Sequence, residues 1–266
     1  MRATLNGSAV DESAWRSVAL TNYGHFTSLL VRDRAVQGLD LHLQRLADAT
    51  RELFGTSLDP ERTQRWMREA VVDGDEWQSM RVTIFSRAFD RERPADPRDA
   101  DVLIATAPAQ THDSAAISAA TTRYQRDAPQ FKHVGTFGLF QQRLLAQRRG
   151  YDDVLFVDRH GLVSEGSVWN IGFFDSEGEG VVWPQAGMLD GVSQRLLQCG
   201  LAECAVRSTH RAIQCSDLAS FRGAFFTNSR RVVVPIHRID DIDYAVDPRD
   251  AEMLRRALAT QPWQPL

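Results

Sequence analysis

Residues 138–200 constrain the fold most, because helical and extended patterns follow one another there with short turns between them. Residues 138–149 carry apolar side chains at helical spacing and are followed by Gly150, a common helix end. Residues 154–163 have the pattern of a β-hairpin, and a second helix is expected to begin near Gly191. Such alternation predicts a mixed α/β fold.

The N-terminal part of the chain shows the same mixture of elements. We expect strands at residues 25–31, 80–85 and 102–109, and a helix capped by Asp40. The polar stretch after residue 110 is the best candidate for a linker. The sequence thus predicts a smaller N-terminal α/β domain over residues 1–115, an interdomain linker over residues 116–130 and a larger C-terminal domain over residues 131–266.

Composition describes an ordinary globular protein and excludes several classes. The chain has 266 residues, 43% hydrophobic, so it can bury a substantial core. A net charge of −4, with arginines spread along the chain, argues against binding to nucleic acid. Three cysteines without C-x-x-C spacing indicate neither disulfides nor a metal site. No apolar run is long enough to span a membrane and no export signal is recognisable, so we expect a cytoplasmic protein.

Lys132 is the only lysine, since the other 30 of the 31 basic residues are arginines. Any chemistry that needs a primary side-chain amine must therefore use Lys132. A desolvated lysine can attack a carbonyl carbon to form a Schiff base, whereas arginine keeps its proton. The alternative is that an arginine-rich composition has left one lysine by accident.

Four motifs follow one another from Lys132 onward. They are Lys132 itself, GYDDVLFVD at residues 150–158, EGSVWN at residues 165–170 and LDGVSQR at residues 189–195. In order and spacing they resemble the class IV (fold type IV) pyridoxal-phosphate enzymes, which include branched-chain and D-amino-acid aminotransferases and aminodeoxychorismate lyase. Weaker similarities at residues 22–31, 42–46 and 226–229 extend the resemblance over most of the chain.

The resemblance implies a two-domain α/β fold of the D-amino-acid aminotransferase type, with pyridoxal 5'-phosphate in the interdomain cleft, and a homodimer. Lys132 would form the Schiff base with the cofactor and then move a proton between the substrate α-carbon and the cofactor. Glu165 would pair with the pyridinium nitrogen, so that the ring can accept electrons. A glutamate before a glycine is otherwise a solvated turn residue.

The cofactor phosphate would lie at the start of a helix, where backbone N–H groups point outward. The resemblance assigns it to the N–H groups of Val192 and Ser193, the Ser193 hydroxyl, Ser229 and the charge of Arg45. Asn170 would orient the loop that carries Glu165. Outside this context, Arg45 reads as a surface residue and Asn170 as a turn amide.

Departures from the family pattern bear on the substrate. Phe137 stands where branched-chain enzymes have a tyrosine, and Thr27 stands where the family has a glutamate. The loop after the second strand holds three arginines that could clamp a carboxylate: Arg87, Arg91 and Arg93. Candidates for substrate binding are Phe26, Phe137 and Arg230, whereas Trp169 reads as core.

The leading functional prediction is transfer of an amino group between an amino acid and a 2-oxo acid. A β-elimination like that of aminodeoxychorismate lyase is an alternative, because that enzyme shares the Lys132-His133 dipeptide. A third possibility is a cofactor-binding homologue without turnover.

Overall fold

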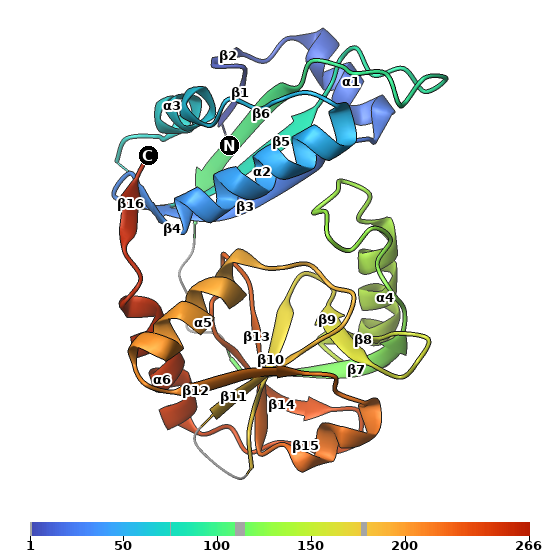
Figure 1. Ribbon diagram of the computed structural model, residues 1–266, viewed down its shortest axis with the longest axis vertical. Coiled ribbons are helices and arrows are strands. Elements are labelled where there is room, and N and C mark those ends of the chain that lie inside the picture. The colour runs from blue at the N-terminus through green and yellow to red at the C-terminus, as the bar shows by residue number, and fades with distance from the viewer. Residues whose placement is uncertain (1, 75, 110–114, 177–179) are drawn as a thin grey trace. The chain divides into compact units, whose positions relative to one another are not determined.

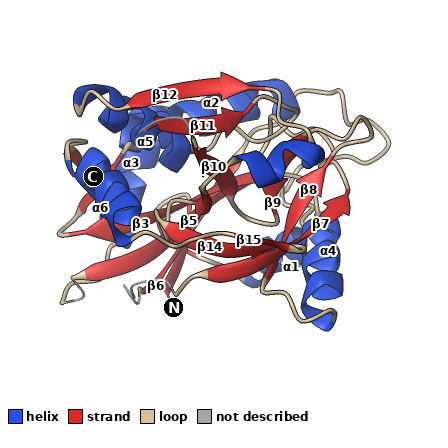
Figure 2. Ribbon diagram, turned by 90° about the horizontal axis from the view of Figure 1, so that it is seen from below, coloured by secondary structure: helices blue, strands red, loops and turns tan. Residues whose placement is uncertain are grey.

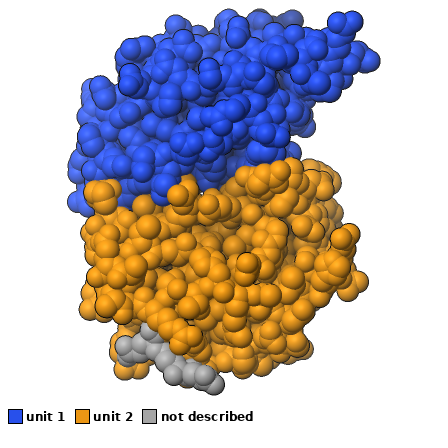
Figure 3. All heavy atoms as spheres, in the orientation of Figure 1, with its two compact units in different colours: residues 1–112, 131–135, 263–266 blue, residues 113–130, 136–262 orange. Residues whose placement is uncertain are grey.

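The structure is a computed structural model that describes residues 2–74, 76–109, 115–176 and 180–266. The chain forms two compact units, which Figure 3 colours separately. Unit 1 takes residues 1–112, 131–135 and 263–266, and unit 2 takes residues 113–130 and 136–262. The segment that carries Lys132 thus belongs to unit 1, although it follows the predicted linker. Residues 110–114, just before the predicted boundary, lie outside the described residues.

Unit 1 is built on a seven-stranded antiparallel sheet with the strand order β16-β4-β3-β5-β6-β1-β2 (Figure 1). Its strands are β1 (Arg2–Leu5), β2 (Ser8–Ala9), β3 (His25–Arg32), β4 (Ala35–Gln37), β5 (Trp77–Phe85), β6 (Asp101–Pro108) and β16 (Trp263–Pro265). The strands β3, β5 and β6 lie where the sequence predicts them. The C-terminal strand β16 completes the edge next to β4.

Helices cover both faces of this sheet. They are α1 (Glu12–Thr21), α2 (Leu39–Phe54) and α3 (Pro60–Ala70). Leu46 of α2 and Met67 of α3 share one core with the sheet, and α1 packs with Phe85 on the other face. The helix α2 begins at Leu39, so Asp40 lies in its first turn and is not the predicted cap. The cap is Gly38 at φ +67°, a backbone conformation that glycine adopts without steric cost.

Unit 2 contains a nine-stranded sheet (Figure 1). Its strands are β7 (Ile117–Arg123), β8 (Asp153–Val157), β9 (Val163–Gly166), β10 (Asn170–Phe174), β11 (Gly180–Pro184), β12 (Arg207–Arg211), β13 (Gly223–Thr227), β14 (Val234–Ile239) and β15 (Ile242–Asp243). The main path runs β12-β11-β10-β13-β14-β7-β8-β9, and β9 also pairs with β10. Six strands therefore close into a ring around an apolar core. Strands outnumber helices in both units (Figure 2).

The predicted linker contains a strand of this ring. Strand β7 pairs in parallel with β8 and with β14, and Ser118, Ala119 and Ala120 are buried. Ala119 packs in the central core, whereas Ala120 packs on the opposite face. Strands covered on both faces typically read as runs of large apolar residues, whereas the small and polar residues of β7 give a weak apolar signal, so the sequence indicated a linker at residues 116–130.

Four helical segments complete unit 2: α4 (Phe137–Arg148), α5 (Val192–Glu203), the 3₁₀ helix η1 (Cys215–Ser220) and α6 (Pro248–Ala259). Leu197 of α5 and Leu254 of α6 pack with Phe225 of β13. The helix α6 begins at Pro248 and is capped by Asp247. None of the described helices is both long and apolar enough to cross a membrane.

The helix α4 differs from the predicted amphipathic helix because it has two apolar faces. Leu139 and Ala146 are buried against strands β7 and β8 of the same unit. Phe137, Phe140 and Leu144 lie on the opposite side and are exposed by 80%, 51% and 41%. Their spacing of three and four residues places them in one stripe.

Candidate active site

Lys132 is fixed to the start of strand β3 by its own backbone. The Phe26 amide donates a hydrogen bond to the Lys132 carbonyl at 2.9 Å, and the Val134 amide donates one to the Gly24 carbonyl at 2.9 Å. The Lys132 Nζ atom lies 5.0 Å from the centre of the Phe26 ring. The amine is therefore positioned over an aromatic ring, which attracts its charged form only weakly.

Arg45 is held by a hydrogen-bond relay between helix α2 and strand β3. Its Nη2 atom donates to the Thr27 hydroxyl oxygen at 2.5 Å. The same oxygen lies 2.7 Å from His42 Nδ1. The hydroxyl can accept from Arg45 and direct its own hydrogen to His42 Nδ1, an arrangement that fits a neutral imidazole. Thr27, a departure from the family glutamate, thus orients the predicted phosphate-binding arginine.

His42 of this relay and the nearby His25 are both buried and neutral. Burial, and then the charges of Arg45 and Lys132, hold the pKa of His42 well below its usual value. Burial, followed by the charge of Arg45, lowers the pKa of His25 to about 3. The Thr50 hydroxyl donates to the Leu46 carbonyl at 2.7 Å, so it accepts from His25 Nε2 at 3.1 Å. Because the imidazoles are neutral, they do not repel the positive charges of Arg45 and Lys132.

Arg81 joins this group, although the sequence analysis missed it. Its guanidinium carbon lies 3.5 Å from the centre of the Phe26 ring, and its Nε atom donates to Thr83 Oγ1 at 3.1 Å. Side chains alternate along a strand, so Phe26 and Ser28 lie on the same face of β3. Arg81 pairs with Ser28 and therefore lies on that face too. Phe26 accordingly contacts both Arg81 and Lys132.

Two of the three arginines proposed as a carboxylate clamp bind protein groups instead. Arg87 forms a salt bridge with Asp101 at 2.9 Å and also bonds it through its backbone amide. Arg91 donates to the Leu20 carbonyl. These partners commit both guanidinium groups within unit 1, which the sequence could not show because the partners are far away in the chain.

Glu165 is a buried carboxylate on strand β9. It is 4% exposed, and its Oε1 atom lies 3.8 Å from Arg126 Nη1, which belongs to a side chain that is also buried. The Leu189 amide points to Oε2 at 3.4 Å. A buried carboxylate requires such compensation, because leaving water is costly for a charge. Glu165 is thus no solvated turn residue, and sequence analysis did not identify Arg126.

The turn after Glu165 is anchored to Asp153, which is fully buried. Ser167 Oγ donates to Asp153 Oδ1 at 2.6 Å, and Trp169 Nε1 donates to Oδ2 at 2.7 Å. Arg143 adds a cation 3.5 Å from the same carboxylate. The Trp169 ring packs in the core, as its sequence context suggested. This network fixes the hairpin that presents Glu165.

Asn170 connects the hairpin to the start of helix α5. Its Nδ2 atom donates to the Leu189 carbonyl at 2.8 Å. Its Oδ1 atom is so close to Gly191 that a Cβ there would lie 1.8 Å away, so this position requires glycine. The side chain of Asn170 therefore holds the entrance to α5, whereas its backbone pairs with Glu165.

The predicted phosphate residues lie in two places in unit 2. Val192 and Ser193 are buried in the first turn of α5, whose cap residue is Gly191. Ser229 is half-buried in a loop closed by Asn228, which accepts from the amides of Arg230 and Arg231 at 2.9 Å each. Asn228 also donates to the Val168 carbonyl at 3.2 Å. The short segment 165–170 thus contacts both phosphate elements.

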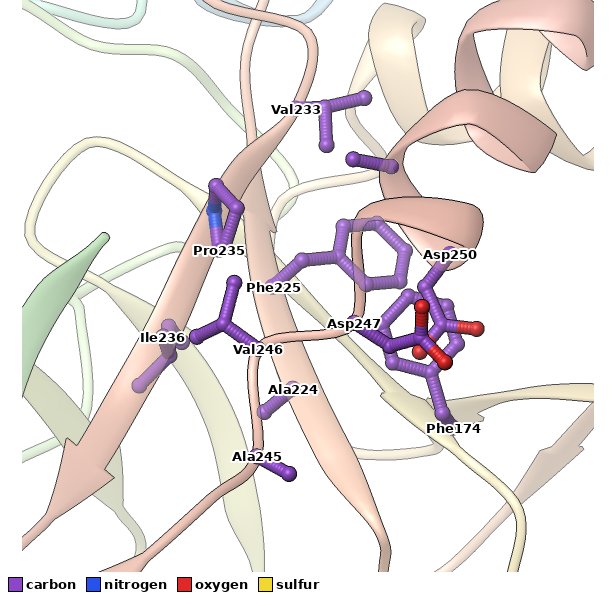
Figure 4. Close-up of a pocket in the computed structure, with 11 residues that line it drawn as sticks. Phe174, Ala224, Phe225, Val233, Pro235, Ile236, Ala245, Val246, Asp247 and Asp250 are labelled. Atoms are coloured by element: carbon purple, nitrogen blue, oxygen red, sulfur yellow. The ribbon is translucent and has the colours of Figure 1, made fainter. Parts of the chain in front are cut away.

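The structure brings together Phe26, Arg45 and Lys132 in unit 1, and Glu165, Asn170, Val192 and Ser193 in unit 2, with Ser229 tied to the same hairpin. Phe137 and Arg230 are exposed. A surface pocket beside the start of α6 has none of these residues in its walls (Figure 4). It is lined by Phe174, Ala224, Phe225, Val233, Pro235, Ile236, Ala245, Val246, Asp247, Asp250 and Ala251.

Comparison with protein families decides what this arrangement is. The family described as amino-transferase class IV matches residues 24–239. The chain belongs to this family. It is therefore a class IV aminotransferase family enzyme, and its cofactor is pyridoxal phosphate. The comparison with curated proteins gave no match.

Solved structures share the fold at low sequence identity. A branched-chain aminotransferase from Thermoproteus uzoniensis is 19% identical, with a TM-score of 0.85 and coverage of 97% of this chain and 93% of that one. A putative 4-amino-4-deoxychorismate lyase from Legionella pneumophila is 16% identical, with a TM-score of 0.83 and coverage of 91% and 92%. A PLP-bound hypothetical aminotransferase from Mycobacterium tuberculosis is 21% identical, with a TM-score of 0.74 and coverage of 92% of each chain.

The residues present fit this cofactor. Glu165 offers a buried carboxylate to a ring nitrogen, and the first turn of α5 offers N–H groups to an anion. The Thr227 hydroxyl is buried without a hydrogen-bond partner among the described residues. Buried polar groups normally have partners, so this hydroxyl marks a place where a polar ligand belongs.

Proposed function

We propose that this enzyme transfers an amino group between an amino acid and a 2-oxo acid, and that Lys132 holds pyridoxal phosphate as a Schiff base. The observation that carries the proposal is the position of the only lysine, whose amine lies on the Phe26 ring beside a cationic cluster. The cofactor supplies an aldehyde carbon for amine exchange and a ring that accepts electrons. Once the substrate amine has displaced Lys132 from the cofactor, the freed Nζ would take the proton from the substrate α-carbon and return it at the cofactor C4′ atom.

Glu165 keeps the ring nitrogen protonated in this proposal. Its carboxylate is buried beside Arg126, whose positive charge stabilises the ionised form. An anion held in a dry site interacts strongly with a pyridinium proton. Arg126 is therefore a positioning residue that keeps Glu165 charged and in place.

The residues that would hold the phosphate supply two kinds of interaction. Arg45 supplies the positive charge, oriented by Thr27. Ser193, Ser229 and the first N–H groups of α5 supply hydrogen bonds. Asn170 supports this role by holding the chain that enters α5.

Arg81 is our candidate for the substrate carboxylate. Its guanidinium group contacts the same Phe26 ring as Lys132. Stacking on the ring leaves the N–H groups in the guanidinium plane able to bind a carboxylate with two hydrogen bonds. The arginines of the loop after β5 support this role less well, because Arg87 already binds Asp101.

A second candidate reaction is β-elimination. The Lys132-His133 dipeptide, which aminodeoxychorismate lyase shares, favours it. Phe137, which has no hydroxyl where the branched-chain enzymes have a tyrosine, is consistent with it as well. The two reactions differ in whether the amino group stays on the cofactor after one cycle.

We also propose that the enzyme is a homodimer. The exposed stripe of Phe137, Phe140 and Leu144 on α4 supports self-association, because apolar side chains gathered on one helix face favour a partner. Leu144→Glu should shift the sedimentation of a dimer to that of a monomer. Gln185→Glu, at an exposed position outside this helix, should leave it unchanged.

Mixing the enzyme with single amino acids tests the reaction. With an L- or D-amino acid and no acceptor, the visible absorbance of the bound cofactor should bleach stoichiometrically, and a 2-oxo acid should restore it. If no amino acid bleaches the absorbance, while aminodeoxychorismate yields pyruvate with the absorbance intact, transamination is wrong and elimination replaces it.

A further inference from the structure

Thr227 is the last residue of strand β13 and is completely buried. Its hydroxyl has no hydrogen-bond partner among the described residues. Desolvation of a hydroxyl without a compensating bond is unfavourable, so a threonine in this state destabilises the protein without ligand. A valine has the same shape and would avoid this cost.

The sheet register shows which way Thr227 points. Phe226, the preceding residue, packs in the central core with Trp169, and Phe225 packs with helices α5 and α6. Successive side chains of a strand alternate, so Thr227 shares the face of Phe225 and points toward α5. It stands opposite Asn170 in the antiparallel pair, which puts their Cβ atoms about 5 Å apart on one face.

Asn170 contacts Gly191, the cap residue of α5. The Thr227 hydroxyl is therefore next to the first turn of this helix, where N–H groups lack intrahelical partners. Gln194, in the same turn, is 3% exposed and also has a side-chain oxygen without a partner among the described residues. Because the Gln194 oxygen can only accept hydrogen bonds, the unsatisfied Thr227 hydroxyl beside the helix start is the group that indicates an anion-binding site.

We propose that Thr227 binds the phosphate group of the cofactor, with its hydroxyl as the donor. This inference rests on the proposed placement of the phosphate at the start of α5 and adds a residue to it. The hydroxyl that lacks a partner in the described part of the protein gains a charged acceptor when the phosphate binds, and such charge-assisted hydrogen bonds are strong. Thr227 therefore lowers the stability of the apoprotein and raises its affinity for the phosphate group.

The test compares the full-length Thr227→Val and Thr4→Val apoproteins with the wild type. Thr4 is a matched control, because its hydroxyl on strand β1 of unit 1 is equally buried without a partner among the described residues. The affinities for pyridoxal phosphate, for inorganic phosphate and for pyridoxal, which has no phosphate, are measured by titration, and the melting temperature of each apoprotein is recorded.

Thr227→Val should weaken pyridoxal phosphate and inorganic phosphate binding about 10- to 100-fold, the range for losing a hydrogen bond to a charged group, and leave pyridoxal binding unchanged. Both valine variants should raise the apoprotein melting temperature by about 2–4 °C. Thr4→Val should leave all affinities unchanged.

Unchanged phosphate affinity in Thr227→Val, or an equal loss for pyridoxal, overturns the assignment of Thr227. Failure of the wild type to bind pyridoxal phosphate is a different result, because it contradicts the proposed function itself. Inorganic phosphate binding by the wild type, lost in Thr227→Val, supports the Thr227 assignment even then.

Discussion

The two groups of site residues differ in the sign of the charge that they present. The group in unit 1 is cationic, with Lys132, Arg45 and Arg81 positioned by an aromatic ring, a threonine hydroxyl and a neutral histidine. The group in unit 2 is built around two buried carboxylates. The cationic group is complementary to an anion, and the carboxylates are complementary to a cation.

The two groups also differ in how their charges are compensated. Glu165 and Asp153 have arginine partners and N–H or O–H donors. Arg45 Nη2 donates to the Thr27 hydroxyl and lies 3.5 Å from His42 Nδ1. The contacts of the two carboxylates therefore include ion pairs, whereas these two contacts of Arg45 are with neutral groups.

The largest effect is expected for Glu165→Gln, which removes the negative charge of the unit 2 group. The variant should still bind the cofactor, but α-proton removal should slow about 10²- to 10³-fold, because a positioned charge is lost from a dry site. Single-turnover absorbance with an amino acid measures this rate. Glu252→Gln, on the exposed side of α6, should keep the full rate. A wild-type rate in Glu165→Gln would mean that another group faces the ring nitrogen.

Asp153→Asn tests whether the unit 2 network is structural. Ser167, Trp169 and Val154 all donate to this carboxylate, and an amide has only one acceptor oxygen for them. The free energy of unfolding should fall by about 2–4 kcal/mol in urea denaturation. Asp243→Asn, at an exposed ion pair, should change it by less than about 1 kcal/mol. Similar losses in both variants would contradict a buried network.

Arg45→Met and Thr27→Val distinguish the effect of the Arg45 charge from the effect of the Thr27 hydroxyl that orients it. Arg45→Met should weaken pyridoxal phosphate binding about 10- to 100-fold, because a charge-assisted contact with phosphate is lost. Thr27→Val should have a smaller effect, and Thr27→Ser should restore affinity by keeping the hydroxyl relay. Titration of each apoprotein measures these affinities. A loss for Thr27→Val that equals the loss for Arg45→Met would show that Thr27 contacts the ligand itself.

The last comparison concerns the pH dependence of stability that the unit 1 histidines cause. The pKa of His25 is lowered to about 3 in the folded protein, below its ordinary value of 6.5. The unfolded chain therefore binds the proton first, so stability is complete above pH 6.5 and falls as pH decreases toward 3, by about 1.4 kcal/mol per pH unit for this group. His25→Gln keeps a donor for Thr50 but cannot titrate, so it should reduce this slope. His160→Gln, in an exposed turn, should not.

The sequence predicted those features that depend on local pattern. Strong apolar alternation located β3, β5 and β6, and the motifs around Lys132 and Glu165 were sufficient to indicate the family. Strand β7 was missed because Ala119 and Ala120 give little apolar signal, although the closed sheet buries both completely. The predicted start of α2 was wrong because an aspartate is a more common helix cap than a glycine, so Asp40 was preferred to Gly38.

Other site features depend on contacts between distant segments, which the sequence could not reveal. Arg126 pairs with Glu165, and Thr27 joins Arg45 to His42, only because the fold brings these segments together. Asn170 was recognised as a site residue, but its side chain contacts Leu189 and Gly191, a role that depends on the path of the chain into α5. Motifs thus identified residues, whereas the fold revealed their partners.

The central claim is that Lys132 is the amine that holds the cofactor. Reduction of the loaded enzyme with borohydride makes a Schiff base permanent, and peptide mapping by mass spectrometry locates the attached cofactor. We predict one labelled peptide, with the label on Lys132, and no label on this peptide in Lys132→Arg. A label on the N-terminal amine of the wild-type enzyme, with Lys132 unmodified, would contradict the account.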